Sequence, residues 1–171
     1  MVIKYIADVY ASNKILDIDE AKRKISEIKS KNKTVGLCHG GFDLLHAGHI
    51  KHFESAKKRC DYLFVSVTSD RFVSLLKGKA RPIFPDKLRA YSIASIQFVN
   101  YVLIADFKLG VEVINILKPS YYIKGPDYMN KHDPDINAER AAIRSVGRKI
   151  VYTTEPKLST SEIIKYIKEN L

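Results

Sequence analysis

The sequence has few cysteines and no long apolar stretch, and both features narrow its class. Its only cysteines, Cys38 and Cys60, lack the number and spacing of a disulfide framework or a zinc site. No stretch reaches the roughly 18 apolar residues that a membrane-spanning helix needs. Charged residues, Lys4 and Asp8, interrupt the N-terminus too early for a signal peptide. We therefore expect a soluble protein of the reducing cytoplasm, without a membrane partner.

Acidic residues are outnumbered by basic ones, which indicates an anionic partner. The chain carries 29 Lys and Arg against 19 Asp and Glu, a formal net charge of +10. Such a charge attracts polyanions, either nucleotides or nucleic acids. However, the basic residues form only short clusters, at 22–24 and 57–59, and no basic tract is interleaved with aromatic residues as in single-strand binders. We interpret these clusters as solvated surface and do not expect a nucleic acid partner.

The N-terminal part of the chain differs in pattern from the rest. Asp17 or Asp19 can cap a helix that runs to about residue 31, and Ala21, Ile25 and Ile28 form one apolar stripe along it. We predict a helical extension over residues 1–33 and one globular domain over residues 34–171. An apolar N-terminal segment beside a small domain also favours a homodimer.

Beyond residue 33, short apolar runs alternate with segments of helical period. This alternation is typical of parallel βαβ units, and near-continuous apolar strands suit a sheet that is covered on both faces. We predict an α/β fold, a Rossmann-like doubly wound sheet of about five parallel strands with an N-terminal helical appendage. The expected strands are 34–39, 62–67, 101–105, 121–124 and 149–153, and the expected helices are 47–59, 70–76, 86–96, 110–117, 138–146 and 160–170.

The turn after the first of these strands has the features of a phosphate site. Gly40 and Gly41 allow a close approach of the backbone, and the helix that opens near residue 47 presents free N–H groups and a positive dipole end. In open parallel sheets, ligands bind at this carboxyl edge. His46 and His49 are three residues apart and can face the same bound group, donating hydrogen bonds as charge develops on a phosphate.

A structural interpretation competes with this one. A pair of histidines can merely cap and pack the end of a helix, and Asp43 can serve only as a turn former. The coincidence of the glycine turn, Asp43, Gly48 and a strand-to-helix junction favours the phosphate site. His39 and His52 lack such surroundings, and we interpret both as structural or surface residues.

Residues 41–49 read GFDLLHAGH, which resembles the HxGH signature of the cytidylyltransferase-like nucleotidyltransferase superfamily. From about residue 14 to the C-terminus, the chain is most similar to the nucleotidyltransferase domain of ADP-heptose synthase. The further matching pieces follow in the same order: Ser69-Asp70, Leu76 to Gly78 with Arg81-Pro82, Pro85 with Arg89, Lys124 to Tyr128, and Ser159 to Ser161.

The resemblance implies catalytic roles for His46, His49 and Lys77. The two histidines stabilise the transferring phosphoryl group, and Lys77 contacts the triphosphate or the substrate phosphate. It further implies two sets of binding residues. Those for the nucleotide are Gly41, Phe42, Asp43, His46, His49, Lys124, Gly125, Asp127, Ser159, Thr160 and Ser161, and those for the second substrate are Lys77, Lys79, Arg81 and Arg89.

Several of these positions also have plain structural interpretations. Lys77 can be an ordinary surface lysine, residues 124–128 a Gly-Pro turn, and Arg89 a salt-bridge partner. Residues 159–161 can simply cap the last helix. No metal is expected to bind the protein directly, because Mg²⁺ would bind through the triphosphate, with Asp127 near the ribose or near a magnesium-linked water.

The expected reaction is transfer of AMP or CMP from ATP or CTP to a phosphorylated sugar or polyol, similar to heptose 1-phosphate, with release of pyrophosphate. Departures from the ADP-heptose synthase pattern at His39, Gly41 and Pro126, and over residues 129–137, leave the base and the acceptor open. Two alternatives remain. One is a glycerol-3-phosphate-type cytidylyltransferase, although residues 155–157 lack the arginine typical of that group. The other is a basic nucleic-acid or regulatory module with a vestigial nucleotide site.

Overall fold

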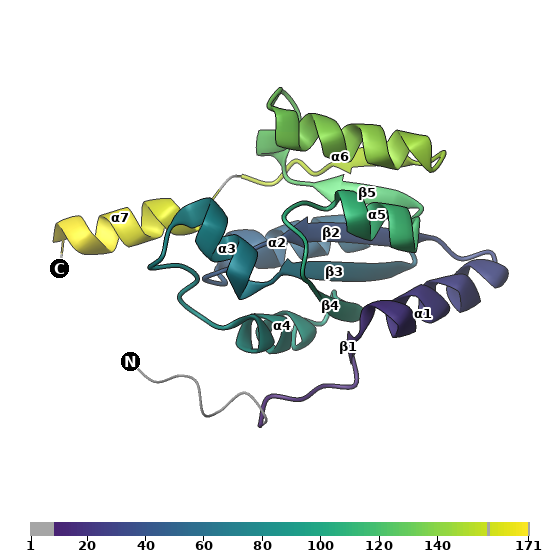
Figure 1. The fold of residues 1–171 in the computed structure, drawn as a ribbon, viewed down its shortest axis with the longest axis horizontal. Coiled ribbons are helices and arrows are strands. Elements are labelled where there is room, and N and C mark those ends of the chain that lie inside the picture. Colours follow the sequence, from purple (N-terminus) through teal and green to yellow (C-terminus); the bar gives the residue numbers. More distant parts are fainter. Residues whose placement is uncertain (1–8, 157, 171) are drawn as a thin grey trace.

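One parallel sheet of six strands organises the chain in the computed structural model, which describes residues 9–156 and 158–170 (Figure 1). The strand order is β1-β4-β3-β2-β5-β6, and every neighbouring pair is parallel. The doubly wound parallel fold predicted from the sequence is confirmed. The strands are β1 (Ile15–Leu16), β2 (Val35–Gly40), β3 (Tyr62–Thr68), β4 (Tyr101–Ala105), β5 (Tyr121–Lys124) and β6 (Lys149–Tyr152).

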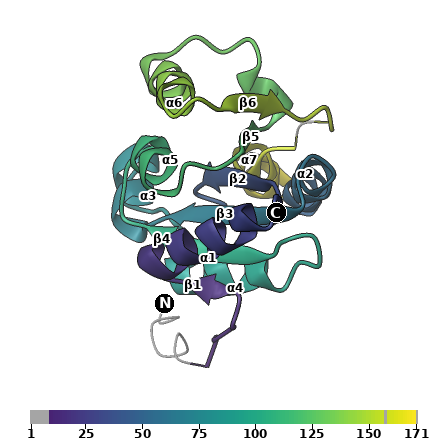
Figure 2. The ribbon, with the colours of Figure 1, turned by 90° about the vertical axis from the view of Figure 1, so that its right-hand side faces the viewer.

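Helices cover both faces of this sheet, as Figure 2 shows for α6 on one side and α2 on the other. Successive residues of a strand point to opposite faces, so Leu37 packs with α1, α5 and α6 while Cys38 packs with α2 and α4. The helices are α1 (Ile18–Ser30), α2 (Ala47–Lys57), α3 (Asp70–Lys77), α4 (Asp86–Ala94), α5 (Val111–Leu117), α6 (Pro134–Ser145) and α7 (Thr160–Asn170), with a 3₁₀ turn, η1 (Pro126–Tyr128).

The sheet has one strand more than the expected number of about five. Residues Ile15 and Leu16 form β1, which pairs with Val102 and Leu103 of β4 at the edge of the sheet. A strand of two residues is too short to show an alternating pattern in the sequence. Its pairing also depends on a partner 87 positions further along the chain, which no local signal records.

Asp17, one of the two proposed caps, is the N-cap of helix α1. The Asp17 carboxylate accepts a hydrogen bond from the Glu20 N–H at 2.7 Å, and the Glu20 carboxylate accepts one from the Asp17 N–H at 2.9 Å. The predicted stripe of Ala21, Ile25 and Ile28 is buried against the sheet and α5. The described part of residues 1–33 therefore shares the core of the sheet, and its division from residues 34–171 stays a prediction.

Helix α6 begins at Pro134, earlier than the expected start at residue 138. The Asp133 carboxylate accepts a hydrogen bond from the Ile136 N–H at 2.9 Å, and Pro134 occupies the first helical position, where its missing N–H has no cost. The loop expected through residue 135 is correspondingly shorter and contains η1. Among the helices of the described ranges, none has the length and apolar character to cross a membrane.

Candidate active site

A cavity lies at the carboxyl edge of the sheet, between the ends of β2 and β5. From β2 the chain continues to β3 on one side, whereas β5 and β6 lie on the other, so this is the point where the winding of the sheet reverses. Open parallel sheets bind ligands at such points. The cavity has a volume of about 250 Å³ and is lined by the end of β2, the start of α2, the β5–η1 connection, Lys77 and residues that lead into α7.

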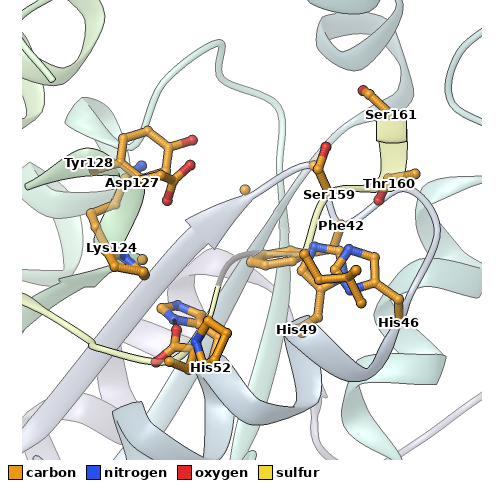
Figure 3. Close-up of a pocket in the computed structure, with 18 of the residues that line it drawn as sticks. Phe42, His46, His49, His52, Lys124, Asp127, Tyr128, Ser159, Thr160 and Ser161 are labelled. Atoms are coloured by element: carbon orange, nitrogen blue, oxygen red, sulfur yellow. Dashed lines mark hydrogen bonds and ion pairs between the residues drawn. The ribbon is translucent and has the colours of Figure 1, made fainter. Parts of the chain in front are cut away.

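His46 and His49 lie together on the cavity wall, as the sequence predicted (Figure 3). Their rings are stacked, with centroids 3.8 Å apart and planes inclined by 21°. His46 is the N-cap of α2, but its side chain makes no capping hydrogen bond. Both ring nitrogens of His46 and the Nδ1 atom of His49 are buried without a hydrogen-bond partner among the described residues. These polar atoms are therefore available to a ligand.

Burial determines the charge of the histidine pair. It lowers the pKa of His49 to about 3, with smaller contributions from the neighbouring His46, His52 and Lys77, and it also lowers the pKa of His46. Both imidazoles are thus neutral near pH 7, and stacking brings no repulsion between like charges. Each neutral ring retains one N–H donor, and an anion bound beside the rings would favour protonation.

Buried charged side chains hold the glycine turn before α2, Gly40-Gly41, on the side away from the cavity. Arg89 is buried and donates to the Gly41 carbonyl, to the Phe84 carbonyl at 2.9 Å and to Asp70 at 2.6 Å. Asp43 is also buried and accepts hydrogen bonds from Arg81 and from the Ile83 N–H. Asp43, Arg81 and Arg89 therefore lie behind the turn, outside the cavity lining, and the exposed Lys79 does not line it either.

Phe42 and Lys77 border the turn on the cavity side. Phe42 has a φ of 44°, an uncommon conformation for a bulky residue, and its ring packs against His49 and Phe53 with centroid distances of 5.4 and 5.2 Å. A Cβ atom on Gly41 would lie 3.9 Å from the Lys77 Nζ atom. The Lys77 amine thus lies over the glycine turn, on the α3 side of the cavity.

A second helix N-terminus faces the same cavity. Ser159, Thr160 and Ser161 line it at the start of α7 (Figure 3), and the Thr160 hydroxyl donates to the Leu44 carbonyl at 3.2 Å. A Cβ atom on Gly48 would lie only 2.8 Å from the Leu158 Cβ atom, so this glycine permits the close approach of the segment before α7. The N-termini of α2 and α7 together provide free N–H groups and two positive dipole ends.

Lys124 and Asp127 line the opposite end of the cavity (Figure 3). The Lys124 amine is buried, forms an ion pair with Glu139 at 2.9 Å and lies 4.3 Å from the centroid of the Tyr128 ring. A Cβ atom on Gly125 would lie 2.8 Å from the Asp127 carboxylate, so Asp127 folds back over this glycine. The charge of Lys124 is already balanced by Glu139, a residue that was not predicted to belong to the site.

Three further polar residues line the cavity: His39, His52 and Glu155. The ring of His39 lies within hydrogen-bonding distance of Ser66, at 3.0 Å, and burial lowers its pKa to about 4. His52 lies 2.9 Å from the Glu155 carboxylate. His52 follows His49 by three residues on α2 and therefore lies on the same helix face, a spacing that could have indicated its position. Glu155 gave no comparable signal, and Lys157, noted beside it in the sequence, lies outside the described residues.

Comparisons with known proteins identify the family of this chain. The sequence model of the cytidylyltransferase-like family matches residues 37–166. The chain is 40% identical over 117 residues to the bifunctional protein HldE of a Nitratiruptor species. This alignment covers 68% of the chain and 25% of that protein. It is 35% identical over 152 residues to the bifunctional protein HldE of Campylobacter jejuni, which covers 89% of the chain and 32% of that protein. The chain thus spans about a quarter to a third of the length of these relatives.

Solved structures show the same fold. A lipopolysaccharide core biosynthesis protein from Thermoplasma volcanium aligns with a TM-score of 0.58 at 27% identity, covering 73% of this chain and 99% of that one. A pantoate-beta-alanine ligase from Francisella tularensis also aligns with a TM-score of 0.58, over 90% of this chain and 76% of that one. The latter is 17% identical and supports the fold alone.

Proposed function

This chain belongs to the cytidylyltransferase-like family and is a nucleotidyltransferase, and we propose that it transfers AMP or CMP from ATP or CTP to a phosphorylated sugar or polyol similar to heptose 1-phosphate. Pyrophosphate is the second product. The observation that carries this proposal is the stacked His46–His49 pair, which lies beside the N-termini of α2 and α7. Three of its ring nitrogens, both of His46 and Nδ1 of His49, are buried without a partner among the described residues. A triphosphate would supply the hydrogen-bond acceptors that these groups lack.

The proposed reaction needs no covalent intermediate. An oxygen of the acceptor phosphate attacks the α-phosphorus of the nucleotide in line, a new P–O bond forms, and the bond between the α-phosphorus and the bridging oxygen breaks to release pyrophosphate. The attacking phosphate is already ionised near neutral pH, so the protein does not have to remove a proton. Positioning and stabilisation of the charge on the pentavalent phosphorus carry the catalysis, and we assign the second task to His46 and His49.

We place the acceptor phosphate near Lys77 and the nucleoside near Lys124 and Asp127. The Lys77 amine lies over the glycine turn on the α3 side of the cavity, whereas the Lys124 and Asp127 side chains lie after β5 on the other side. The α-phosphate would then lie between the two substrates, beside the histidines. Arg81 and Arg89, which are paired with Asp43 and Asp70, hold the turn in place from behind, and Lys79 adds positive charge from the exposed loop.

Magnesium fits this arrangement as a partner of the nucleotide. Within the described ranges, no group of three or more His, Cys, Asp or Glu side chains is placed to hold a metal ion, so we propose that oxygens of the triphosphate supply most of the Mg²⁺ ligands. The ion would neutralise charge on the β- and γ-phosphates and favour the departure of pyrophosphate. Asp127 is the cavity carboxylate that we place near a magnesium-linked water or the ribose.

We also propose that the protein acts in the cytoplasm as a homodimer. The free thiols Cys38 and Cys60 fit a reducing compartment, and the apolar N-terminal segment is the sequence feature that favours a dimer. Sedimentation of the purified chain would test the assembly.

Pyrophosphate release from a matrix of substrates tests the proposed reaction. ATP, CTP, GTP and UTP would each be combined with sugar 1-phosphates, among them a heptose 1-phosphate, and with glycerol 3-phosphate. We expect release only with ATP or CTP and only when a phosphorylated sugar or polyol is present. Release with CTP and glycerol 3-phosphate alone would identify the glycerol-3-phosphate-type alternative. No pyrophosphate release from any substrate pair, together with salt-sensitive binding of DNA or RNA, would favour the binding module instead.

A further inference from the structure

The cavity wall contains a buried carboxylate oxygen that has no partner. Glu155 follows β6, and its side chain is 4% exposed. One oxygen, Oε1, accepts hydrogen bonds from the Thr153 hydroxyl at 2.7 Å and from the His52 Nδ1 atom at 2.9 Å. The other oxygen, Oε2, is buried without a partner among the described residues, although Glu155 lines the cavity. A buried acceptor in this position is suited to a donor on the ligand.

The carboxylate keeps its charge in this position. Burial opposes ionisation of Glu155, but the hydrogen bonds from His52 and Thr153 outweigh burial and lower its pKa to about 2. Burial likewise opposes protonation of His52, but Cys38 and Glu155 outweigh it and raise the pKa of His52 to about 10. His52 therefore carries a proton on Nδ1, which it donates to Oε1. The free Oε2 atom can act only as an acceptor.

This charge also restricts which part of a nucleotide can lie against Glu155. A carboxylate repels phosphate groups, which instead match the positive ends of α2 and α7. The base or the ribose is left for Glu155. Asp127 offers the second carboxylate of the cavity, beside Gly125 after β5, and we have placed it near the ribose. The base is then the remaining source of a donor for the buried oxygen.

We propose that the free oxygen of Glu155 accepts a hydrogen bond from the exocyclic amino group of the base, so that the site selects adenine or cytosine over bases with a carbonyl oxygen at that position. His52 and Thr153 hold the carboxylate in place for this contact. The inference rests on the proposed function only in requiring that a nucleoside triphosphate occupies the cavity. It explains how one side chain can exclude ITP relative to ATP and UTP relative to CTP.

The variant Glu155→Gln tests this contact because it replaces the carboxylate by an amide of nearly the same volume. A protonated His52 donates to Oε1, which favours the carbonyl oxygen of the glutamine at that position and its NH₂ group at the position of Oε2. The acceptor becomes a donor without a change in volume. We expect the wild-type protein to bind ATP about 10- to 100-fold more tightly than ITP, or CTP more tightly than UTP by the same factor. The variant should lose or invert that preference.

The readout is the dissociation constant of ATP, ITP, CTP and UTP, measured by calorimetry with Mg²⁺ and without an acceptor. Glu54→Gln is the matched control, because Glu54 pairs with Lys51 and Lys58 outside the cavity lining; it should keep the wild-type preference. Thermal melting establishes that both variants are folded. A preference unchanged in Glu155→Gln would overturn the proposal, as would a variant whose main defect is weaker discrimination against 2′-deoxy-ATP or 2′-deoxy-CTP, since that result assigns Glu155 to the ribose.

The binding test and the turnover test can fail separately. If the base preference inverts but no acceptor supports pyrophosphate release, the role of Glu155 stands and the proposed reaction fails. If pyrophosphate is released from ATP or CTP while the preference of Glu155→Gln matches that of the wild type, the reaction stands and the role of Glu155 fails.

Discussion

At the scale of single residues, the site combines neutral histidines with charges that are already paired. Burial keeps His46 and His49 uncharged, while the Lys124 amine is bound to Glu139 and the Arg89 guanidinium to Asp70. The two imidazoles, with three buried ring nitrogens that have no partner among the described residues, are therefore placed together with the Lys77 amine to meet new negative charge on the cavity wall. Neutral donors can stabilise a transition state without binding the triphosphate too tightly beforehand.

Replacing His46 or His49 by Ala should lower kcat by roughly 100-fold or more, because each change removes a donor to the transferring phosphoryl group. The measurement is steady-state pyrophosphate release with the best substrate pair from the matrix. His132→Ala is the control, since His132 is exposed and lies outside the cavity lining. Turnover that stays at the wild-type level in both site variants would contradict the assignment.

At the scale of elements, the site depends on how α7 meets α2. The contact is made by the Thr160 hydroxyl on the Leu44 carbonyl and by the space left over Gly48. Figure 1 shows α7 reaching beyond the sheet, so that mainly its first turn approaches the rest of the molecule. The phosphate-binding geometry that we propose is consequently sensitive to small shifts of this one junction.

Gly48→Ala should lower kcat/KM by about 10- to 100-fold, because a misplacement of about 1 Å at a reacting centre has effects of this size. The added Cβ atom would lie 2.8 Å from the Leu158 Cβ atom and 3.0 Å from the His46 ring, so the lead-in to α7 must move away. Adding Leu158→Gly relieves the closer of these contacts and should recover part of the activity. A Gly48→Ala enzyme with wild-type kcat/KM would show that the junction tolerates displacement.

At the scale of the whole molecule, one core joins the N-terminal helix to the sheet. Ile25 of α1 is 2% exposed and packs in the same cluster as Leu37 of β2 and Ile114 of α5. Residues before 34 thus contribute apolar surface that the sheet would otherwise expose on that face. We therefore expect the described part of the N-terminal segment to unfold together with the sheet.

Ile25→Ala should lower the free energy of unfolding by about 2–5 kcal/mol, the usual cost of such a cavity in a core. Urea unfolding followed by circular dichroism provides the measurement, and a single transition would show that α1 and the sheet unfold together. Lys31→Ala, at an exposed position whose side chain is 67% accessible, should change stability by less than about 0.5 kcal/mol. An Ile25→Ala protein as stable as this control would support an independent extension instead.

The sequence by itself determined the fold class, the family and the position of the histidine pair. These depend on local signals: apolar strands and helical periods that alternate along the chain, and a glycine turn with His46 and His49 three residues apart on one helix. The predicted start of α6 at residue 138 was late, although the cap and first-turn proline at Asp133-Pro134 are adjacent residues and give a local signal.

Only the tertiary structure decided which distant residues share the cavity wall. β1 exists because β4 lies beside it, and Lys124 is neutralised by Glu139 of α6. His52 and Glu155 are 103 positions apart in the chain, and they meet because α2 and the end of β6 border the same cavity. Their pairing leaves one oxygen of Glu155 free, and no local pattern records it, since hydrogen bonds and burial between distant segments arise only when the sheet brings those segments together.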